Sequence, residues 1–179
     1  MTTRLSHVTI RGVEQSDCER VQAVADDWSG STRCAPLPRV LFEHFGPTGF
    51  VAELDGELVG YLLGFVSQTY PGEAYVHAVA VRPEHRRREL GTALYERFFG
   101  AAYEHYCSVV RAAAAPADLP TIAFHQALGF HLEPGDGESH GVPVRRDYPA
   151  AGESRVQFVR CVAELHAIAP LLVGDRLAS

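Results

Sequence analysis

The sequence predicts an α/β fold, in which helices are layered on a sheet that contains both antiparallel and parallel strand pairs. Two apolar runs, 49–54 and 57–67, are joined by Asp55-Gly56, the dipeptide most typical of a tight β-hairpin. A third run, 73–81, is apolar on both faces and is therefore typical of an interior strand. Beyond it, helix-like and strand-like segments alternate, which favours some parallel pairing.

The N-terminal part predicts a strand followed by two helices. Residues 7–11 alternate and carry β-branched side chains, as a strand does. Residues 16–28 have helical apolar spacing, acids in the first turn and Ser16 as the N-cap. Residues 37–46 predict a short helix with a proline near its start and a glycine at its end.

The C-terminal part predicts two further helices and three strands. In chain order the expected elements are a helix from Leu90, a strand at 106–114, a helix at 119–128, a short strand at 130–133 and a last strand at 154–162. Residues 134–154 are polar and rich in glycine and proline, so we expect them to separate the last two strands. We predict one domain, 1–162, and a tail, 163–179, that is either a packed or dimer-exchanging arm or disordered.

Composition limits the partners. The chain has 179 residues and 46% hydrophobic content, which suits one domain with a sizeable core. Its 16 basic residues are all arginine and are outnumbered by 22 acidic residues, so no broad cationic surface exists for nucleic acid or a membrane. The four cysteines are far apart and there is no signal-peptide pattern, so we expect a cytoplasmic protein with reduced thiols.

The stretch "HRRRELGTAL", 85–94, predicts an anion site. A helix that begins just after a turn presents free N–H groups and the positive end of its dipole. Gly91 keeps the backbone accessible, and three consecutive arginines add charged donors, so a pyrophosphate fits. A Walker A loop is excluded because it needs a lysine, and a dinucleotide GxGxxG is absent here.

Two motifs in this region resemble those of the GNAT acyltransferases. "VAVRPEHRRRELGTALYERFF" resembles the family's acetyl-CoA motif, whose three fixed places are filled by Arg88, Gly91 and Ala93. "DLPTIAFHQALGF", at the distance expected in that family, resembles its second motif, with Asp118, Thr121 and His125 in the Asn, small-residue and aromatic places. The two motifs together cover about a third of the chain and occur in the family's order.

The resemblance implies a GNAT fold and an acetyl-CoA-dependent reaction. The implied fold is a mixed, mostly antiparallel sheet of about seven strands with about four helices, splayed between the strands at 73–81 and 106–114. The implied function is transfer of an acetyl group from acetyl-CoA to a primary amine of a small molecule or peptide by direct attack. The implied cofactor contacts are Val79, Ala80 and Val81 with the pantetheine arm, the turn residues Arg86, Arg87, Arg88, Glu89, Leu90, Gly91 and Thr92 with the pyrophosphate, and Asp118.

The chain departs from the family pattern at three of these positions. Many relatives have glycines where this chain has Arg87 and Glu89, and Glu89 adds a negative charge that we expect to face solvent. Asp118 in place of Asn keeps an acceptor and loses the amide donors.

Two histidines are the expected proton-transfer groups. The attacking amine must be neutral, so a base is needed, and relatives place a glutamate or histidine at the position of His77. We expect His77 to be partly desolvated, neutral and the base, acting through water. His125 stands where relatives direct a tyrosine hydroxyl at the sulfur, and the helix C-terminus is expected to favour its protonated form as the acid. Glu43, His44 and Tyr148 lie in segments that usually wall the acceptor site.

Other possibilities stay open. A silent GNAT domain that binds CoA as a sensor is one alternative, and an arginine-rich nucleic-acid-binding domain, disfavoured by the charge, is another. The histidines have no metal-ligand spacing, so no metal is expected. A homodimer is expected from the apolar residues of the tail, Leu165, Ile168, Leu171, Leu172 and Val173. The acceptor cannot be read from the sequence.

Overall fold

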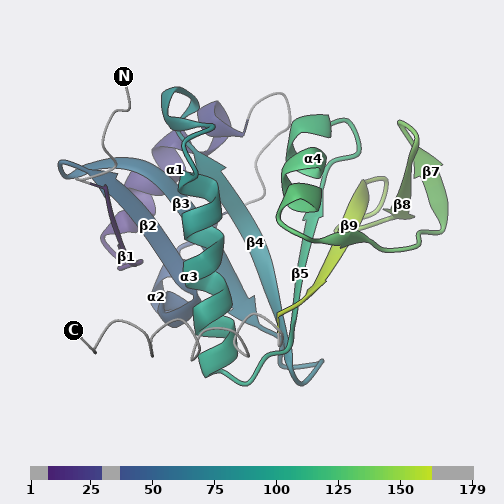
Figure 1. Ribbon diagram of the computed structural model, residues 1–179, viewed down its shortest axis with the longest axis horizontal. Coiled ribbons are helices and arrows are strands. Elements are labelled where there is room, and N and C mark those ends of the chain that lie inside the picture. The colour runs from purple at the N-terminus through teal and green to yellow at the C-terminus, as the bar shows by residue number, and fades with distance from the viewer. Residues whose placement is uncertain (1–7, 30–36, 163–179) are drawn as a thin grey trace, which may run out of the picture.

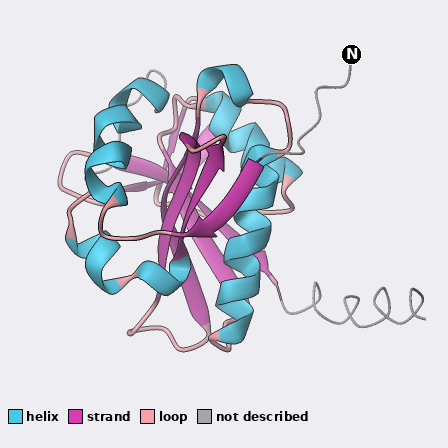
Figure 2. Ribbon diagram, turned by 90° about the vertical axis from the view of Figure 1, so that its left-hand side faces the viewer, coloured by secondary structure: helices cyan, strands magenta, loops and turns pink. Residues whose placement is uncertain are grey.

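The computed structural model describes residues 8–29 and 37–162, which form one sheet with helices on both faces (Figure 2). The described strands are β1 (Val8–Gly12), β2 (Gly49–Leu54), β3 (Glu57–Val66), β4 (Glu73–Val81), β5 (Val109–Ala114), β6 (His131–Leu132), β7 (Gly137–Ser139), β8 (Val142–Arg146) and β9 (Ser154–Cys161). The described α-helices are α1 (Asp17–Trp28), α2 (Val40–His44), α3 (Leu90–Glu104) and α4 (Leu119–Ala127).

The strand order is β1-β2-β3-β4-β5-β9-β8-β7, with β6 also paired to β9 (Figure 1). Every described pair is antiparallel except β4 with β5. The predicted mixed, mostly antiparallel sheet is therefore confirmed. The predicted hairpin is also present, because Asp55 and Gly56 both have positive φ, of 52° and 84°, as a type I′ turn requires.

The sheet has more strands than the expected seven, because the polar stretch expected only to separate the last two strands contains a hairpin. β7 and β8 pair across a turn at His140 and Gly141, both with positive φ. A polar hairpin of three to five residues a strand has no apolar alternation to mark it, so its strands are hard to read from the sequence. β8 joins β9 at one end, which extends the sheet beyond the predicted last strand.

Two hydrophobic cores lie on opposite faces of the sheet. One packs α3 and α4 against the strands through large side chains, including Leu94, Phe98, Phe130 and Phe158. The other packs α1 and α2 through a second set, including Val21, Trp28, Leu41, Phe42 and Tyr61. Figure 1 shows α3 in front of the strands and α1 behind them. The two faces of the sheet are therefore covered by different helices and different core side chains.

The start of α1 is fixed by a buried ion cluster. Asp17, 1% exposed, accepts hydrogen bonds from Arg11 of β1 and from Arg20, and both arginines also contact Glu53 of β2. Burial alone would raise the pKa of Asp17, but the hydrogen bonds from Arg11 and the backbone outweigh it and lower that pKa. Anchored there, α1 runs with its other end, Trp28, toward the centre of the sheet.

The tail expected at 163–179 lies outside the described residues, so its boundary with the domain stays a prediction.

Candidate active site

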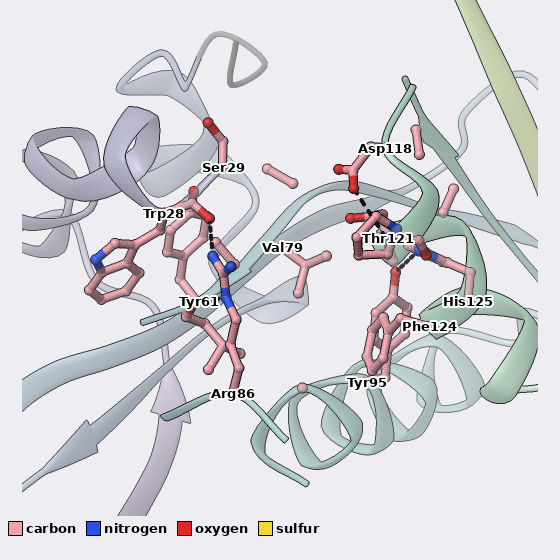
Figure 3. A pocket seen from close by; sticks show the side chains of 18 of the residues that line it. Trp28, Ser29, Tyr61, Val79, Arg86, Tyr95, Asp118, Thr121, Phe124 and His125 are labelled. Carbon is pink, nitrogen blue, oxygen red and sulfur yellow. Dashed lines mark hydrogen bonds between the residues drawn. The ribbon is translucent and has the colours of Figure 1, made fainter. Parts of the chain in front are cut away.

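A cleft of about 850 Å³ runs along the centre of the sheet (Figure 3). Its walls come from the end of α1, from β3, β4 and β5, from the turn before α3, and from α4 and β9. It brings together nearly all of the predicted site residues, namely His77, Val79, Ala80, Val81, Arg86, Arg87, Glu89, Leu90, Gly91, Thr92, Asp118 and His125. Arg88 instead lines a smaller neighbouring pocket beside β1.

The cleft opens where β4 and β5 part. Their parallel register covers only Glu73–Val76 opposite 109–112. Beyond Val76 the strands have no register with each other, so the edge of Val79–Val81 that faces β5 lacks a described strand partner. Unpaired strand edges bind extended groups that carry amides. The predicted splay of the sheet is thus confirmed between these two strands.

A β-bulge places His77 at the point of separation. In the pairing of β3 with β4, Leu63 lies opposite Ala78 and Gly64 opposite Val76, so His77 is the extra residue. The bulge changes which side chains face each core, since Val76 and Val79 both pack on the α3 side. His77 is half-buried and lines the cleft, as expected for a group that meets both protein and substrate.

The turn before α3 forms a concave set of backbone N–H groups. Arg87 and Glu89 have φ of 59° and 61°, and left-handed residues in a turn can bring successive N–H groups to one side, as in an anion-binding nest. The N–H groups of 90–92 have no partner within the helix, because the first helical bond runs from the Ala93 N–H to the Glu89 carbonyl. The turn can therefore bind an anion. Positive φ favours glycine, so both positions would accept a glycine without strain.

Gly91 is required for a different reason from the one expected. A Cβ atom at this position would lie 2.9 Å from Cζ of Phe124 on α4. The missing side chain thus lets the ring of Phe124 approach the start of α3, rather than only making room for a phosphate. Glu89, by contrast, is exposed, as expected.

The side chain of Arg86 is already occupied. Its Nη2 donates to the carbonyl of Trp28 at 2.6 Å, and its Nε donates to the carbonyl of Val81 at 3.1 Å. Its backbone N–H donates to Pro83, so this amide is not among the free groups of the turn. The expected role of the Arg86 amide in surrounding a pyrophosphate stays a prediction, and it would require this N–H to leave its present partner.

His125 lies in a buried aromatic cluster opposite the turn. It is 2% exposed, and its ring stacks on Phe158 with centroids 4.5 Å apart. Its Nδ1 lies 2.8 Å from the carbonyl of Thr121, and its Nε2 lies 2.6 Å from the hydroxyl of Tyr95. Because a carbonyl only accepts, Nδ1 carries the proton, and in the neutral ring Nε2 accepts from Tyr95.

Both groups of this pair are held neutral. Burial lowers the pKa of His125 and outweighs the opposing hydrogen bond to Thr121 and the charge of Asp118. Burial also raises the pKa of the Tyr95 hydroxyl. The expectation that the helix end would favour protonated His125 is wrong, because desolvation is the larger effect.

Asp118 has a structural partner as well as a place in the cleft. It is the N-cap of α4, and its Oδ1 accepts from the Thr121 N–H at 3.1 Å. This is the capping interaction that an Asn at the same position would also make. One such bond leaves the carboxylate with further acceptor sites for a ligand in the cleft.

Sequence reasoning missed Tyr95, Trp28 and Tyr61. Tyr95 follows Leu94 inside α3, where a tyrosine reads as ordinary core, and nothing local signals that its hydroxyl meets a histidine on another helix. Trp28 and Tyr61 stack with centroids 6.3 Å apart and line the cleft on the α1 side.

The residues predicted to wall the acceptor site lie outside the lining of this cleft. Glu43 accepts from Gln15 on the surface, and Tyr148 donates to the hydroxyl of Tyr75. Within the described ranges, no group of His, Cys, Asp and Glu has the arrangement of a metal site. No described helix is long and apolar enough to cross a membrane.

The model of the acetyltransferase (GNAT) family matches residues 16–130. L-2,4-diaminobutyric acid acetyltransferase of Nocardia farcinica is 26% identical over 129 residues, which are 72% of this chain and 67% of that protein. An N-alpha-acetyltransferase of Sulfurisphaera tokodaii is 33% identical over 114 residues, 58% of this chain and 63% of that protein. The chain thus spans about two thirds of these relatives.

A solved structure also has this fold. Diaminobutyrate acetyltransferase from Paenibacillus lautus, in complex with L-2,4-diaminobutyric acid and coenzyme A, superimposes with a TM-score of 0.66 at 22% identity. The match covers 86% of this chain and 97% of that one.

Proposed function

Since the chain belongs to the GNAT acetyltransferase family, we propose that it transfers an acetyl group from acetyl-CoA to a primary amine of a small molecule or peptide. The amine attacks the thioester directly, and coenzyme A leaves as the thiol. The observation that carries the proposal is that one cleft joins the nest of N–H groups before α3 to the split between β4 and β5, with His77 at the split.

The two ends of the cleft suit the two ends of acetyl-CoA. The pyrophosphate is bound by the N–H groups of 87–92, and the exposed guanidinium of Arg88 adds positive charge beside them. The amides of the pantetheine arm pair with the free edge of Val79–Val81, as an added strand would. The thioester then lies near the bulge.

His77 accepts the proton of the attacking amine through a water molecule. An alkyl amine with a pKa near 10.4 is about 3 units from neutral at pH 7, so its deprotonation costs roughly 4 kcal/mol. His77 is half-buried and lines the cleft, and a neutral imidazole nitrogen accepts a proton. Val76 and Ala78 fix the backbone on either side of it through their pairing with β3.

The leaving thiolate receives its proton through Tyr95. His125 is neutral at rest, so Nε2 carries a proton, taken up from solvent, only briefly during the transfer. As the Tyr95 hydroxyl proton passes to the sulfur in the cleft, the Nε2 proton replaces it, so both side chains end neutral. Direct donation by Tyr95 alone would leave a buried phenolate, which its raised pKa opposes.

The relatives suggest two classes of acceptor, a small diamino acid and a protein N-terminus. The test is an acceptor screen with acetyl-CoA that follows thiol release and looks for a product heavier by one acetyl group. The panel contains L-2,4-diaminobutyrate, other diamines, amino acids and short peptides. Release of thiol with at least one amine supports the proposal. Coenzyme A binding without turnover on any class would instead support a silent module.

His77 is tested with the best acceptor from that screen. We expect His77→Ala to lower kcat by about 10²- to 10⁴-fold, most strongly at low pH, where little free amine exists. Coenzyme A affinity is expected to survive. An unchanged kcat/KM from about pH 6 to about pH 9 would show that another group takes the proton.

We further propose that the protein works in the cytoplasm, without nucleic acid, and as a homodimer. The four widely spaced cysteines support the first statement, the net charge of −6 supports the second, and the apolar residues of the tail support the third. Sedimentation of the full chain at high concentration tests the dimer.

A further inference from the structure

Arg86 differs from the two arginines that follow it. Its guanidinium holds two backbone carbonyls, one at the end of β4 and one at the end of α1. Among the described residues, no hydrogen bond or ion pair involves the side chain of Arg87 or of Arg88. The three consecutive arginines are therefore not equivalent, although the sequence gives no sign of it.

The contact with Trp28 completes the end of α1. The last carbonyls of a helix have no donor within it and carry the negative end of the dipole, so a cation there is stabilising. α1 has no basic residue in its own last turn. Arg86 supplies the cation from 58 residues away in the chain, at the short distance of 2.6 Å.

The end of α1 is also a wall of the cleft. Trp28 stacks on Tyr61 of β3 with an angle of 19° between the rings, and both residues line the cleft together with Ser29. Figure 3 shows Trp28, Ser29, Tyr61 and Arg86 on one side, facing Tyr95, Phe124 and His125 across Val79. Since α3 and α4 cover the opposite face, the second substrate must approach the split from the α1 side.

Arg86 thus lies between the anion-binding turn and the wall that meets the acceptor. We propose that Arg86 is a positioning residue, which links occupancy of the turn by coenzyme A to the placement of Trp28 and hence to acceptor binding. The proposal rests on the proposed function in taking coenzyme A as the anion and an amine acceptor as the second substrate. Such a link is reciprocal, so acceptor binding must tighten coenzyme A by the same factor.

The chain provides its own probe, because Trp28 is the sole tryptophan. The first measurement uses protein without ligand and compares Arg86→Gln with the matched control Arg87→Gln. Both variants lose one positive charge, but only the first loses the bond to Trp28. We expect Arg86→Gln to shift the emission of Trp28 and to raise its quenching by acrylamide about twofold or more, because its 7% exposure increases. Arg87→Gln is expected to match the wild type.

The second measurement adds coenzyme A and follows heat of binding and Trp28 emission in parallel. In Arg87→Gln we expect weaker binding but the full wild-type change in emission at saturation. In Arg86→Gln we expect binding within about threefold of wild type and an emission change that is largely lost. At saturating acetyl-CoA, the KM for the acceptor rises about 5- to 20-fold in Arg86→Gln, with a smaller change in kcat.

Two results would overturn the inference. One is an unaltered Trp28 signal in Arg86→Gln without ligand, which refutes the contact whether or not the protein binds coenzyme A. The other is a loss of coenzyme A affinity in Arg86→Gln as large as in Arg87→Gln, while the change in Trp28 emission at saturation stays as large as in the wild type. Arg86 would then be a phosphate ligand. A wild-type protein that binds no coenzyme A would contradict the proposed function, and the first measurement would still decide the contact.

Discussion

The turn before α3 and the wall of α4 face each other across the cleft, yet they are built on opposite principles. The turn is exposed, carries three arginines and contains two left-handed residues that are not glycine. The wall where α4 meets α3 holds a buried polar pair, Tyr95 of α3 and His125 of α4, which is enclosed by Phe124, Phe130 and Phe158. One side offers charge to solvent, and the other keeps its ionisable groups neutral.

The difference shows how one cleft serves two electrostatic tasks. Binding a phosphate needs donors that stay charged, which water favours, whereas passing a proton needs groups whose charged forms are costly and therefore brief. Separate walls allow both within one site. The predictions below disturb one wall, or the contact between the two, and the largest expected effect comes first.

Gly91→Val is expected to disturb both walls at once, because Gly91 is where they touch. Its Cβ would lie 2.9 Å from the Phe124 ring, so either α4 or the start of α3 must move. We expect coenzyme A affinity to fall about 100-fold or more by calorimetry. Gly100→Val in the same helix is the control, since a Cβ there meets nothing within 4 Å. Normal affinity in Gly91→Val would mean that the walls do not depend on this contact.

Tyr95→Phe and His125→Phe disturb only the buried wall. Each is expected to lower kcat by about 10²-fold, because each removes one member of a single proton path. The double variant is expected to be no slower than either single one, since a path that is already broken cannot be broken again. Coenzyme A binding reports on the turn and is expected to stay. Losses that multiply in the double variant would show that the two groups act separately.

Glu89→Gly alters only the turn, and we expect it to raise both the stability of the protein and its affinity for coenzyme A. The substitution relieves a left-handed residue, worth about 1 kcal/mol, and removes a negative charge beside the anion site. We expect higher stability and a coenzyme A affinity about fivefold tighter. Glu89→Gln removes the charge and keeps the strained backbone. It is therefore expected to bind coenzyme A more tightly than the wild type but to be no more stable. Equal stability of the two variants would argue against strain at this position.

The smallest expected effect is a pH dependence of stability that comes from the buried wall. The pKa of His125 is lowered in the folded protein, so the folded state resists protonation more than the unfolded state does. This contribution is fully present above the unfolded pKa near 6.5 and is lost as pH falls toward the folded value. Lowering the pH from about 7.5 to about 5 should therefore reduce the melting temperature of the wild type more than that of His125→Phe. Parallel losses in the two proteins would contradict the lowered pKa.

Much of the fold could be predicted because its signals are local. The turn at Asp55-Gly56 and the doubly apolar strand β4 depend on neighbours in sequence, and both lie where expected. β7 and β8 were not predicted, since their hairpin is polar and short. β5 also begins three residues later than expected, because Tyr106 adopts a φ of 61° that no strand allows.

The candidate site divides in the same way. The anion turn and the position of His77 follow from a local motif, whereas the partners of Arg86 and His125 lie 58 and 30 residues away along the chain. Such contacts depend on how the helices pack, so these partners could not be predicted from the sequence. Gly91 is the mixed case, since its need for a small side chain was evident but the neighbour that requires it, Phe124, was not.

The short register between β4 and β5 also sets an order of assembly. The strands from β1 to β4 pair with neighbours in strand order, so this half gains most of its contacts early and at low entropic cost. β5 has only a four-residue register with β4, Glu73–Val76, and its long partner is β9, at the far end of the described chain. The half that contains α4 must therefore wait for β9 before β5 is flanked on both sides. We therefore expect the ligand cleft, which lies between the two halves, to be completed late in folding.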